Sequence, residues 1–209
     1  SQASHEFADE TAKPLEQFSY LYDGIGNRTS ATVAGRVQAY TPDDQNRYLN
    51  RSVPPYYHLR GEADEDAGIL VNQQTVSRHG RAFWKELSFD NASSALFGGI
   101  RIIAAKPGAG PGGADLVAVE NRTAYLAPAT ESFLYDADGN LTEDARRTYE
   151  WDAENRLIRV TDKAGAVEPP DPPFAAPSRK RVSHEYDTAS RRVRKLVEEW
   201  DAGSSSWQA

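Results

Sequence analysis

Hydrophobic and polar residues alternate in short runs along much of this chain. Residues 18–22 and 29–40 show the alternation in the first fifty positions, and residues 81–89 (RAFWKELSF) show it again. A period of two is the side-chain spacing of a β-strand, and Gly, Pro, Asn and Asp between the runs favour turns. The pattern therefore predicts an all-β chain built of short antiparallel strands.

One sequence phrase occurs twice in the second half of the chain. Residues 135–141 (YDADGNL) and 151–157 (WDAENRL) each contain an aromatic residue, an Asp, two variable residues, a turn residue, a polar residue and a branched apolar residue. An Asp side chain can accept hydrogen bonds within a turn, and Gly or Asn tolerates left-handed backbone. Aromatic and branched residues favour a half-buried pleated surface. The phrase therefore predicts strand, tight turn and strand, and its repetition predicts an antiparallel hairpin sheet.

Further copies lie toward both ends of the chain. Residues 22–28 (YDGIGNR) match closely, and residues 186–192 (YDTASRR) match with Ser in the Gly position. We interpret residues 40–47 (YTPDDQNR) as a copy that begins at Tyr40 and carries two extra residues. The next aromatic residue of the pattern is Tyr135, so the long interval between them indicates an inserted module.

These copies resemble the YD-repeat (Rhs-type) family of large secreted or cell-surface proteins, and they cover about half of the chain. The resemblance implies a long spiralling β-sheet that encloses a toxin or serves as an adhesive shell, and a secreted or cell-surface location. Many family members also carry a self-cleavage motif built on Asp-Pro-x-Gly. Residues 171–174 are Asp-Pro-Pro-Phe, with Phe in the Gly position, so we do not assign self-cleavage to this chain.

The segment between the repeat copies has a different pattern. Residues 69–76, 81–89, 95–105 and 116–126 are strand candidates with turn residues between them, which favours a small antiparallel β-sandwich-like module inserted at a hairpin tip. Residues 1–7 lack the repeat pattern and end in a dipeptide that a common cloning site encodes. We divide the chain into probable tag or vector residues (1–7), first repeat strands (8–52), the inserted module (53–130), second repeat strands (131–203) with a proline-rich loop (163–181), and a tail (204–209), and we expect a frayed end at residues 203–206.

Composition excludes several classes of function. The net charge of −7 disfavours a nucleic-acid binder, because phosphate contacts need a basic surface. The absence of Cys excludes disulfides, thiolate metal sites and a cysteine nucleophile. No apolar run approaches the length of a membrane span. We expect no cofactor, and we expect a glycan or a protein surface as the partner.

Aromatic residues of the module are the candidate ligand-binding groups. Tyr56, Tyr57 and Trp84 lie on predicted strands, and Arg81 precedes Trp84 by three positions. Exposed aromatic rings can stack on sugar faces while Arg binds hydroxyl groups, although the same rings could instead fill the core of the sandwich. The alternation in residues 81–89 favours a core position for Phe83 and leaves both positions open for Trp84.

Two other kinds of site stay open as alternatives. Asp136, Asp138 and Asn140 have the spacing of a calcium loop, but Gly at its sixth position and Glu at its twelfth are missing, which favours a plain turn. A hydrolase site of the glycosidase or phosphoesterase kind could form between the repeat sheet and the module from His58, His79 and Glu86.

The preferred hypothesis is therefore a non-catalytic structural or adhesive fragment of a secreted or cell-surface YD-repeat protein. Its open sheet edges should promote self-association, because unpaired strands accept partners. The hydrolase is the alternative, and it requires that folding gather a His and an acid around a concave space.

Overall fold

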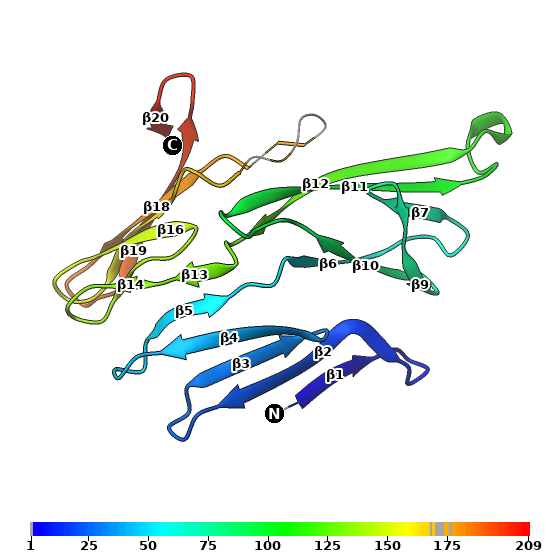
Figure 1. Cartoon of the computed structure of the whole chain (residues 1–209). Helices are drawn as coiled ribbons and strands as arrows, with labels where there is room; N and C mark the ends of the chain where they lie inside the picture. The colour runs from blue at the N-terminus through cyan, green and yellow to red at the C-terminus, as the bar shows by residue number, and fades with distance from the viewer. Residues whose placement is uncertain (1, 168, 170–173, 176) are drawn as a thin grey trace.

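The computed structural model describes residues 2–167, 169, 174–175 and 177–209 (Figure 1). The described residues form twenty β-strands and one short 3-10 turn, η1 (Pro111–Gly113), and the strands pair antiparallel within four sheets. This confirms the predicted all-β fold class. Among the described residues, none forms a helix with the length and apolar character that a bilayer crossing requires. Asp171, Pro172 and Pro173 of the Asp-Pro-Pro-Phe segment lie outside the described residues.

The first repeat sheet has six strands in the order β1-β2-β3-β4-β5-β13. Its strands are β1 (Gln2–Glu6), β2 (Ala12–Tyr22), β3 (Arg28–Val33), β4 (Arg36–Pro42), β5 (Tyr48–Ser52) and β13 (Thr130–Ser132). Residues 1–7, which we set apart from the fold, thus supply strand β1, and Ser4 of that strand pairs with Gln17 of β2. That these residues derive from a tag or vector stays a prediction.

The chain leaves the first repeat sheet after Ser52 and returns to it at Thr130, which pairs directly with Ser52. The returning strand is fixed by an ion pair in which Arg51 Nε donates to Oε2 of the buried Glu131 at 2.5 Å. The chain therefore leaves and re-enters this sheet through two adjacent strands, β5 and β13.

The second repeat sheet has seven strands in sequence order. They are β14 (Leu134–Tyr135), β15 (Leu141–Glu143), β16 (Arg147–Trp151), β17 (Leu157–Asp162), β18 (Lys180–Tyr186), β19 (Arg192–Asp201) and β20 (Ser206–Gln208). Residues 204–209, which we set apart as a tail, include β20, which pairs with β19. Trp207 lies opposite Trp200, and their rings meet edge-to-face with centroids 5.3 Å apart, a favourable aromatic geometry.

The module consists of two sheets, ordered β6-β10-β9 and β12-β11-β7-β8. The strands of the first are β6 (Tyr56–Glu62), β10 (Ala82–Ser88) and β9 (Ser77–His79), and those of the second are β12 (Leu116–Leu126), β11 (Leu96–Lys106), β7 (Gly68–Val71) and β8 (Gln74–Thr75). Buried side chains from both sheets form one core cluster: Leu59, Ile69, Val71, Phe83, Leu87, Ile100, Ile102 and Ala124.

Strand β10 shows how the module meets the first repeat sheet. Its alternation places Phe83 and Leu87 in the module core, as the sequence predicts for Phe83. Glu86 lies on the opposite face of β10 and forms an ion pair with Arg36 of β4. Strands β6 and β10 of the module therefore lie beside strands β2 and β4 of the first repeat sheet (Figure 1).

Candidate functional site

The Asp of each repeat copy organises a turn of the same geometry. In the turn that begins at Asp136, Oδ1 accepts the backbone N–H groups of Asp138 and Asn140 at 3.1 and 2.8 Å. The N–H of Asp136 in turn donates to the Asn140 carbonyl at 3.0 Å. Asp23, Asp43, Asp152 and Asp187 repeat this pattern. The residue three after each Asp has a positive φ: Gly26, Asn46, Gly139, Asn155 and Ser190.

The carboxylates in these turns are already satisfied by donors of the protein. Asn140 Nδ2 donates to the second oxygen of Asp136 at 3.1 Å. Partial desolvation raises the pKa of Asp136, but the hydrogen bonds from Asn140 outweigh it, so the net pKa lies below its usual value. At Asp43 the backbone N–H of Arg47 is the largest cause of a lowered pKa. These groups form a turn, and no cluster of three His, Cys, Asp or Glu ligands is gathered in the described part of the chain.

In three of the five turns, those closed by Asn27, Asn140 and Arg156, the closing residue also contacts the neighbouring turn. Asn27 Nδ2 donates to Asn46 Oδ1 at 2.9 Å, and Asn140 Nδ2 donates to Asn155 Oδ1 at 2.7 Å. Two polar ladders therefore run from one repeat to the next along the ends of the hairpins.

The aromatic residue of a repeat is a second link between neighbours. Trp151 Nε1 donates to the carbonyl of Leu141 at 2.8 Å, and Tyr186 Oη donates to the carbonyl of Leu157 at 2.9 Å. In both cases the acceptor is the residue that follows the preceding turn. The aromatic position thus combines a half-buried ring with a polar atom at its end. A buried Tyr or Trp usually finds a hydrogen-bond partner for that atom.

The copy that we interpreted as beginning at Tyr40 was assigned the wrong start. Asp43 makes the turn, so Pro42 occupies the aromatic position and no extra residues are present. Proline has no side-chain donor for the hydrogen bond that links one repeat to the next. Tyr48 supplies a link instead, because its Oη accepts the backbone N–H of Arg28 at 3.1 Å.

A cavity of about 540 Å³ lies between the start of the first repeat sheet and the module. Two of the predicted ligand-binding residues, Arg81 and Trp84, line it. Tyr57 packs against the module core instead, and the ring of Tyr56 lies 3.8 Å from the Arg36 guanidinium. The structure therefore brings together only half of the predicted group. The other lining residues are Phe7, Lys13, Pro14, Glu16, Arg60, Gly61, Glu62, Glu65, His79, Ala82 and Phe83.

Aromatic rings form one wall of this cavity. Phe7 stacks on His79 with ring centroids 4.3 Å apart, and it lies 6.3 Å from the Trp84 ring. His79 Nε2 is 3.0 Å from Asp9 Oδ2. Sequence analysis missed Phe7 because residues 1–7 were set apart, although an aromatic residue beside a polar lead-in was a usable signal.

Charged side chains of both signs form the rest of the cavity. Arg60 Nη1 is 2.9 Å from Glu16 Oε1, and Arg60 also donates to the carbonyl of Leu15. These contacts tie β6 to β2. Aromatic surface with flanking charged groups suits a polar ligand with one apolar face.

The proposed catalytic residues do not converge on this cavity. His58 Nε2 is 3.1 Å from Glu86 Oε2, so these two do meet, beside a small space of about 130 Å³. His79 pairs with Ala82 of β10. Ala82 is four residues from Glu86 on that strand, which corresponds to about 13 Å at the rise of a β-strand, so His79 lies far from Glu86.

Arg36 sets the protonation state of Glu86. Its guanidinium donates to both carboxylate oxygens, at 2.9 and 2.5 Å. These hydrogen bonds are the largest cause of the lowered pKa of Glu86, and they outweigh its partial desolvation. A carboxyl held ionised in this way cannot be the general acid that a glycosidase needs.

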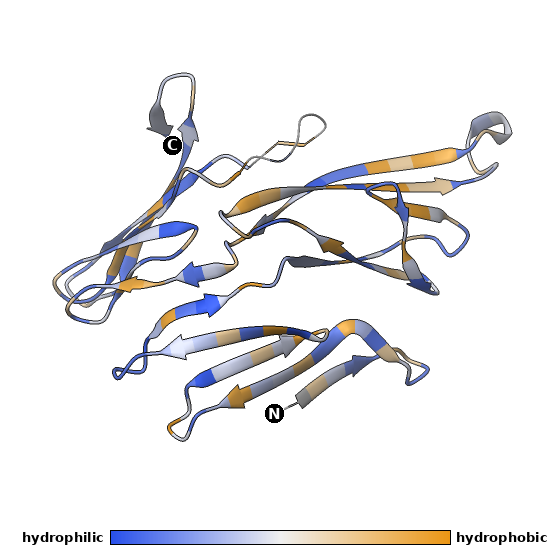
Figure 2. Cartoon of the chain, in the orientation of Figure 1, coloured by the Kyte–Doolittle hydropathy of each residue, from blue (hydrophilic) through white to orange (hydrophobic). Residues whose placement is uncertain are grey.

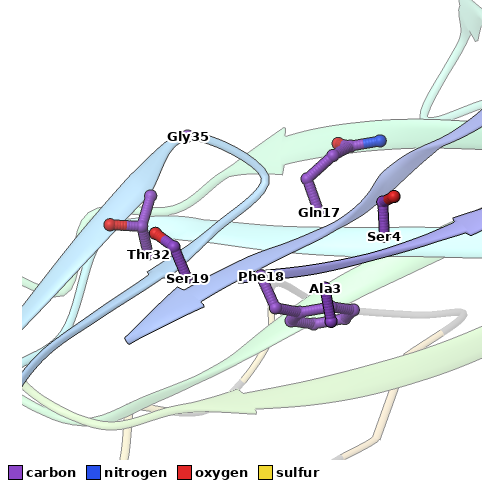
Figure 3. A pocket seen from close by; sticks show the side chains of 7 residues that line it. All are labelled: Ala3, Ser4, Gln17, Phe18, Ser19, Thr32 and Gly35. Carbon is purple, nitrogen blue, oxygen red and sulfur yellow. The ribbon is translucent and has the colours of Figure 1, made fainter. Parts of the chain in front are cut away.

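A second hollow of about 400 Å³ lies over strands β1 to β3 (Figure 3). Figure 3 shows Gln17 and Ser4 on one side of the ribbon and Phe18 on the other. The residues that line the hollow include one aromatic ring, Phe18, and no charged side chain.

Comparison with known proteins places the repeats in a family. Residues 135–167 match the RHS Repeat family. A stretch of 67 residues is 40% identical to the tRNA nuclease WapA of Bacillus subtilis (strain 168), and equally to the tRNA3(Ser)-specific nuclease WapA of Bacillus spizizenii. That stretch is 32% of this chain and 2% of each relative. The matched segment is therefore similar to an RHS repeat, and aspartate turns of the same geometry recur at Asp23, Asp43 and Asp187 outside it.

Proposed function

We propose that this chain is a non-catalytic structural segment of a larger secreted or cell-surface protein, and that it presents a binding module on a repeat sheet. The observation that carries the proposal is the bond from Tyr135 Oη to the carbonyl of Tyr48 at 3.1 Å. Tyr135 makes the same hydrogen bond as Trp151 and Tyr186 do, but its acceptor, the Tyr48 carbonyl, precedes the module in the sequence. This hydrogen bond therefore joins the first repeat sheet to the second, which supports a continuous structural role for the repeats.

The cavity between the sheet and the module is the proposed binding site, with a glycan as its ligand. Trp84 and the Phe7–His79 stack offer aromatic surface, and Arg81, Arg60 and Glu16 offer donors and acceptors at its edge. Sugars present an apolar face and a rim of hydroxyl groups, which matches this combination.

Binding of soluble oligosaccharides, measured by calorimetry, tests the proposal. Trp84→Ala should lower the affinity at least tenfold, while Tyr22→Ala, an exposed ring on β2, should leave it unchanged. Equal binding by the Trp84→Ala variant, or no binding by the parent protein to any oligosaccharide tried, would contradict the assignment of this cavity.

A hydrolase site at His58 and Glu86 is the second candidate, because these residues are in hydrogen-bond contact. The bidentate pair with Arg36 argues for a structural role instead. Turnover of glycoside or phosphoester substrates that is lost in His58→Ala would favour the enzyme. The relatives are named as tRNA nucleases, but the net charge of −7 is unfavourable for binding tRNA phosphates, so we do not extend that activity to this chain.

A further inference from the structure

The four described sheets end in eight strands that each have one unpaired edge. Seven of these end strands contain between two and seven residues, whereas β12 contains eleven. Short edge strands are one way in which proteins prevent pairing between molecules. Strand β12 is the exception among the described end strands.

Strand β12 also lacks two other features that protect an edge, a proline and a β-bulge. It contains no Pro, and its pairing with β11 is unbroken from Leu116 opposite Lys106 to Leu126 opposite Leu96. Residues 116–122 are all exposed, and the side chains of Val117 and Val119 are 55% and 48% accessible. Figure 2 shows this hydrophobic stretch at the end of β12 that adjoins the η1 loop.

The open edge lies beside an incompletely filled part of the module core. A cavity of about 330 Å³ separates β12 from β6, the end strand of the facing sheet. Its apolar lining includes Ile69, Phe83, Ile102 and Val119. A strand added to β12 would satisfy its free backbone groups and cover part of this surface.

The charges of β12 indicate which strand fits. Glu120 and Arg122 lie on the same face, with Arg122 Nε 2.5 Å from Glu120 Oε1. In an antiparallel pair of identical strands centred on Asn121, each Glu120 lies opposite Arg122 of the second copy. A pair centred on Glu120 would instead oppose two like charges, which is unfavourable.

We propose that β12 is a self-complementary edge through which two copies of this chain pair antiparallel about Asn121. The contact is isologous, because each copy contributes the same strand and the same two ion pairs. It specifies which open edge carries the self-association expected from the sequence, and it does not depend on glycan binding.

Sedimentation equilibrium from micromolar to millimolar concentration tests this pairing. The parent protein should shift toward the mass of a dimer as its concentration rises. Glu120→Arg and Arg122→Glu should each stay monomeric, because each places like charges opposite one another. An equimolar mixture of the two variants should form a heterodimer, and the double variant E120R/R122E should dimerise again.

The matched control changes the charge of one residue in a similar ion pair that lies between two inner strands and not on an open edge. Glu185→Arg breaks the exposed pair with Arg194 between the inner strands β18 and β19, and it should leave dimerisation unchanged. A parent protein that stays monomeric throughout, or an E120R variant that dimerises as well as the parent, overturns the proposal. Hydrogen exchange of the parent protein gives an independent readout: β12 amides should gain protection at high concentration, and a gain confined to another edge is equally decisive against the proposal.

Discussion

The Tyr135 hydroxyl donates to the main-chain carbonyl of Tyr48, a residue 87 positions earlier, at 3.1 Å. The ring of Tyr135 also lies 4.9 Å from the guanidinium of Arg47. Tyr186 makes the equivalent pair of contacts with Leu157 and Arg156 where no module intervenes. The insertion has therefore left the contact between successive repeats intact.

Tyr135→Phe should lower the free energy of unfolding by about 1 kcal/mol, the usual value of one hydrogen bond, because it leaves the Tyr48 carbonyl without this donor. Tyr186→Phe should cost a similar amount. The control is Tyr22→Phe, whose ring is exposed and which should change stability by less than about 0.5 kcal/mol. Urea denaturation measures all three, and equal midpoints for Y135F and Y22F would refute the role of the link.

The aspartate side chains of the turns should make the free energy of unfolding depend on pH in the acid range. Folding lowers the pKa of Asp23, Asp43, Asp136, Asp152 and Asp187 below the usual value. The unfolded chain therefore binds more protons than the folded chain as the pH falls below about 4, so stability should decrease from there through the folded pKa values.

Urea midpoints measured between neutral pH and acid test this dependence. Asp136→Asn removes one titrating group and keeps a side-chain oxygen as acceptor, so it should flatten the dependence on pH. Asp138→Asn, at an exposed position of the same turn, is the control and should not. Calcium added at neutral pH should leave the midpoint of the parent protein unchanged. A calcium-dependent rise that Asp138→Asn abolishes would revive the calcium hypothesis.

Two phenols, those of Tyr125 and Tyr149, should have pKa values well above the usual value for tyrosine. Burial raises the pKa of Tyr125 to about 12. Burial, followed by the hydrogen bond to Asp144, does the same for Tyr149, to about 12. Because folding raises these pKa values above the unfolded value of about 10, their contribution to stability is complete below pH 10 and is lost as the pH rises toward 12. Ultraviolet titration of phenolate should show a late step that shrinks in Tyr125→Phe and Tyr149→Phe. A single transition near the ordinary value would contradict this expectation.

Gly61 should be intolerant of any side chain. A Cβ at this position would lie 2.4 Å from Cζ of Phe83, which is buried in the module core. Gly61→Ala should therefore cost about 1 to 3 kcal/mol, as overpacking of a core does. Gly24→Ala is the control, since nothing lies within 4 Å of a Cβ there. Thermal denaturation followed by circular dichroism distinguishes the two, and equal melting temperatures would disprove the steric argument.

The repeat turns could be predicted from sequence because their hydrogen bonds are local. An Asp and the residue four positions later make most of the contacts in each turn, so the phrase itself encodes the geometry. The error at Tyr40 came from requiring an aromatic residue in a position that Pro42 fills. The alternation of β10 likewise indicated which face of the strand carries Phe83, because burial of one face has a period of two.

The candidate site could not be predicted in the same way because its contacts are not local. Phe7 and Trp84 approach each other only because the module folds back over the first repeat sheet. The pair of Arg36 with Glu86 joins residues 50 positions apart, and it changes Glu86 from a candidate acid into a structural anion. Adjacent residues of a strand face opposite sides, so either Tyr56 or Tyr57 could face the core. Tyr57 does so because it pairs with Leu87 of β10, a residue of the core cluster.

The direct pairing of Ser52 with Thr130 leaves the two ends of the module on adjacent strands, about 5 Å apart. Any domain whose own termini lie side by side would satisfy the same condition. The pair of strands β5 and β13 is thus a natural insertion point, where one domain could be exchanged for another during evolution or by engineering without redesign of the supporting sheet.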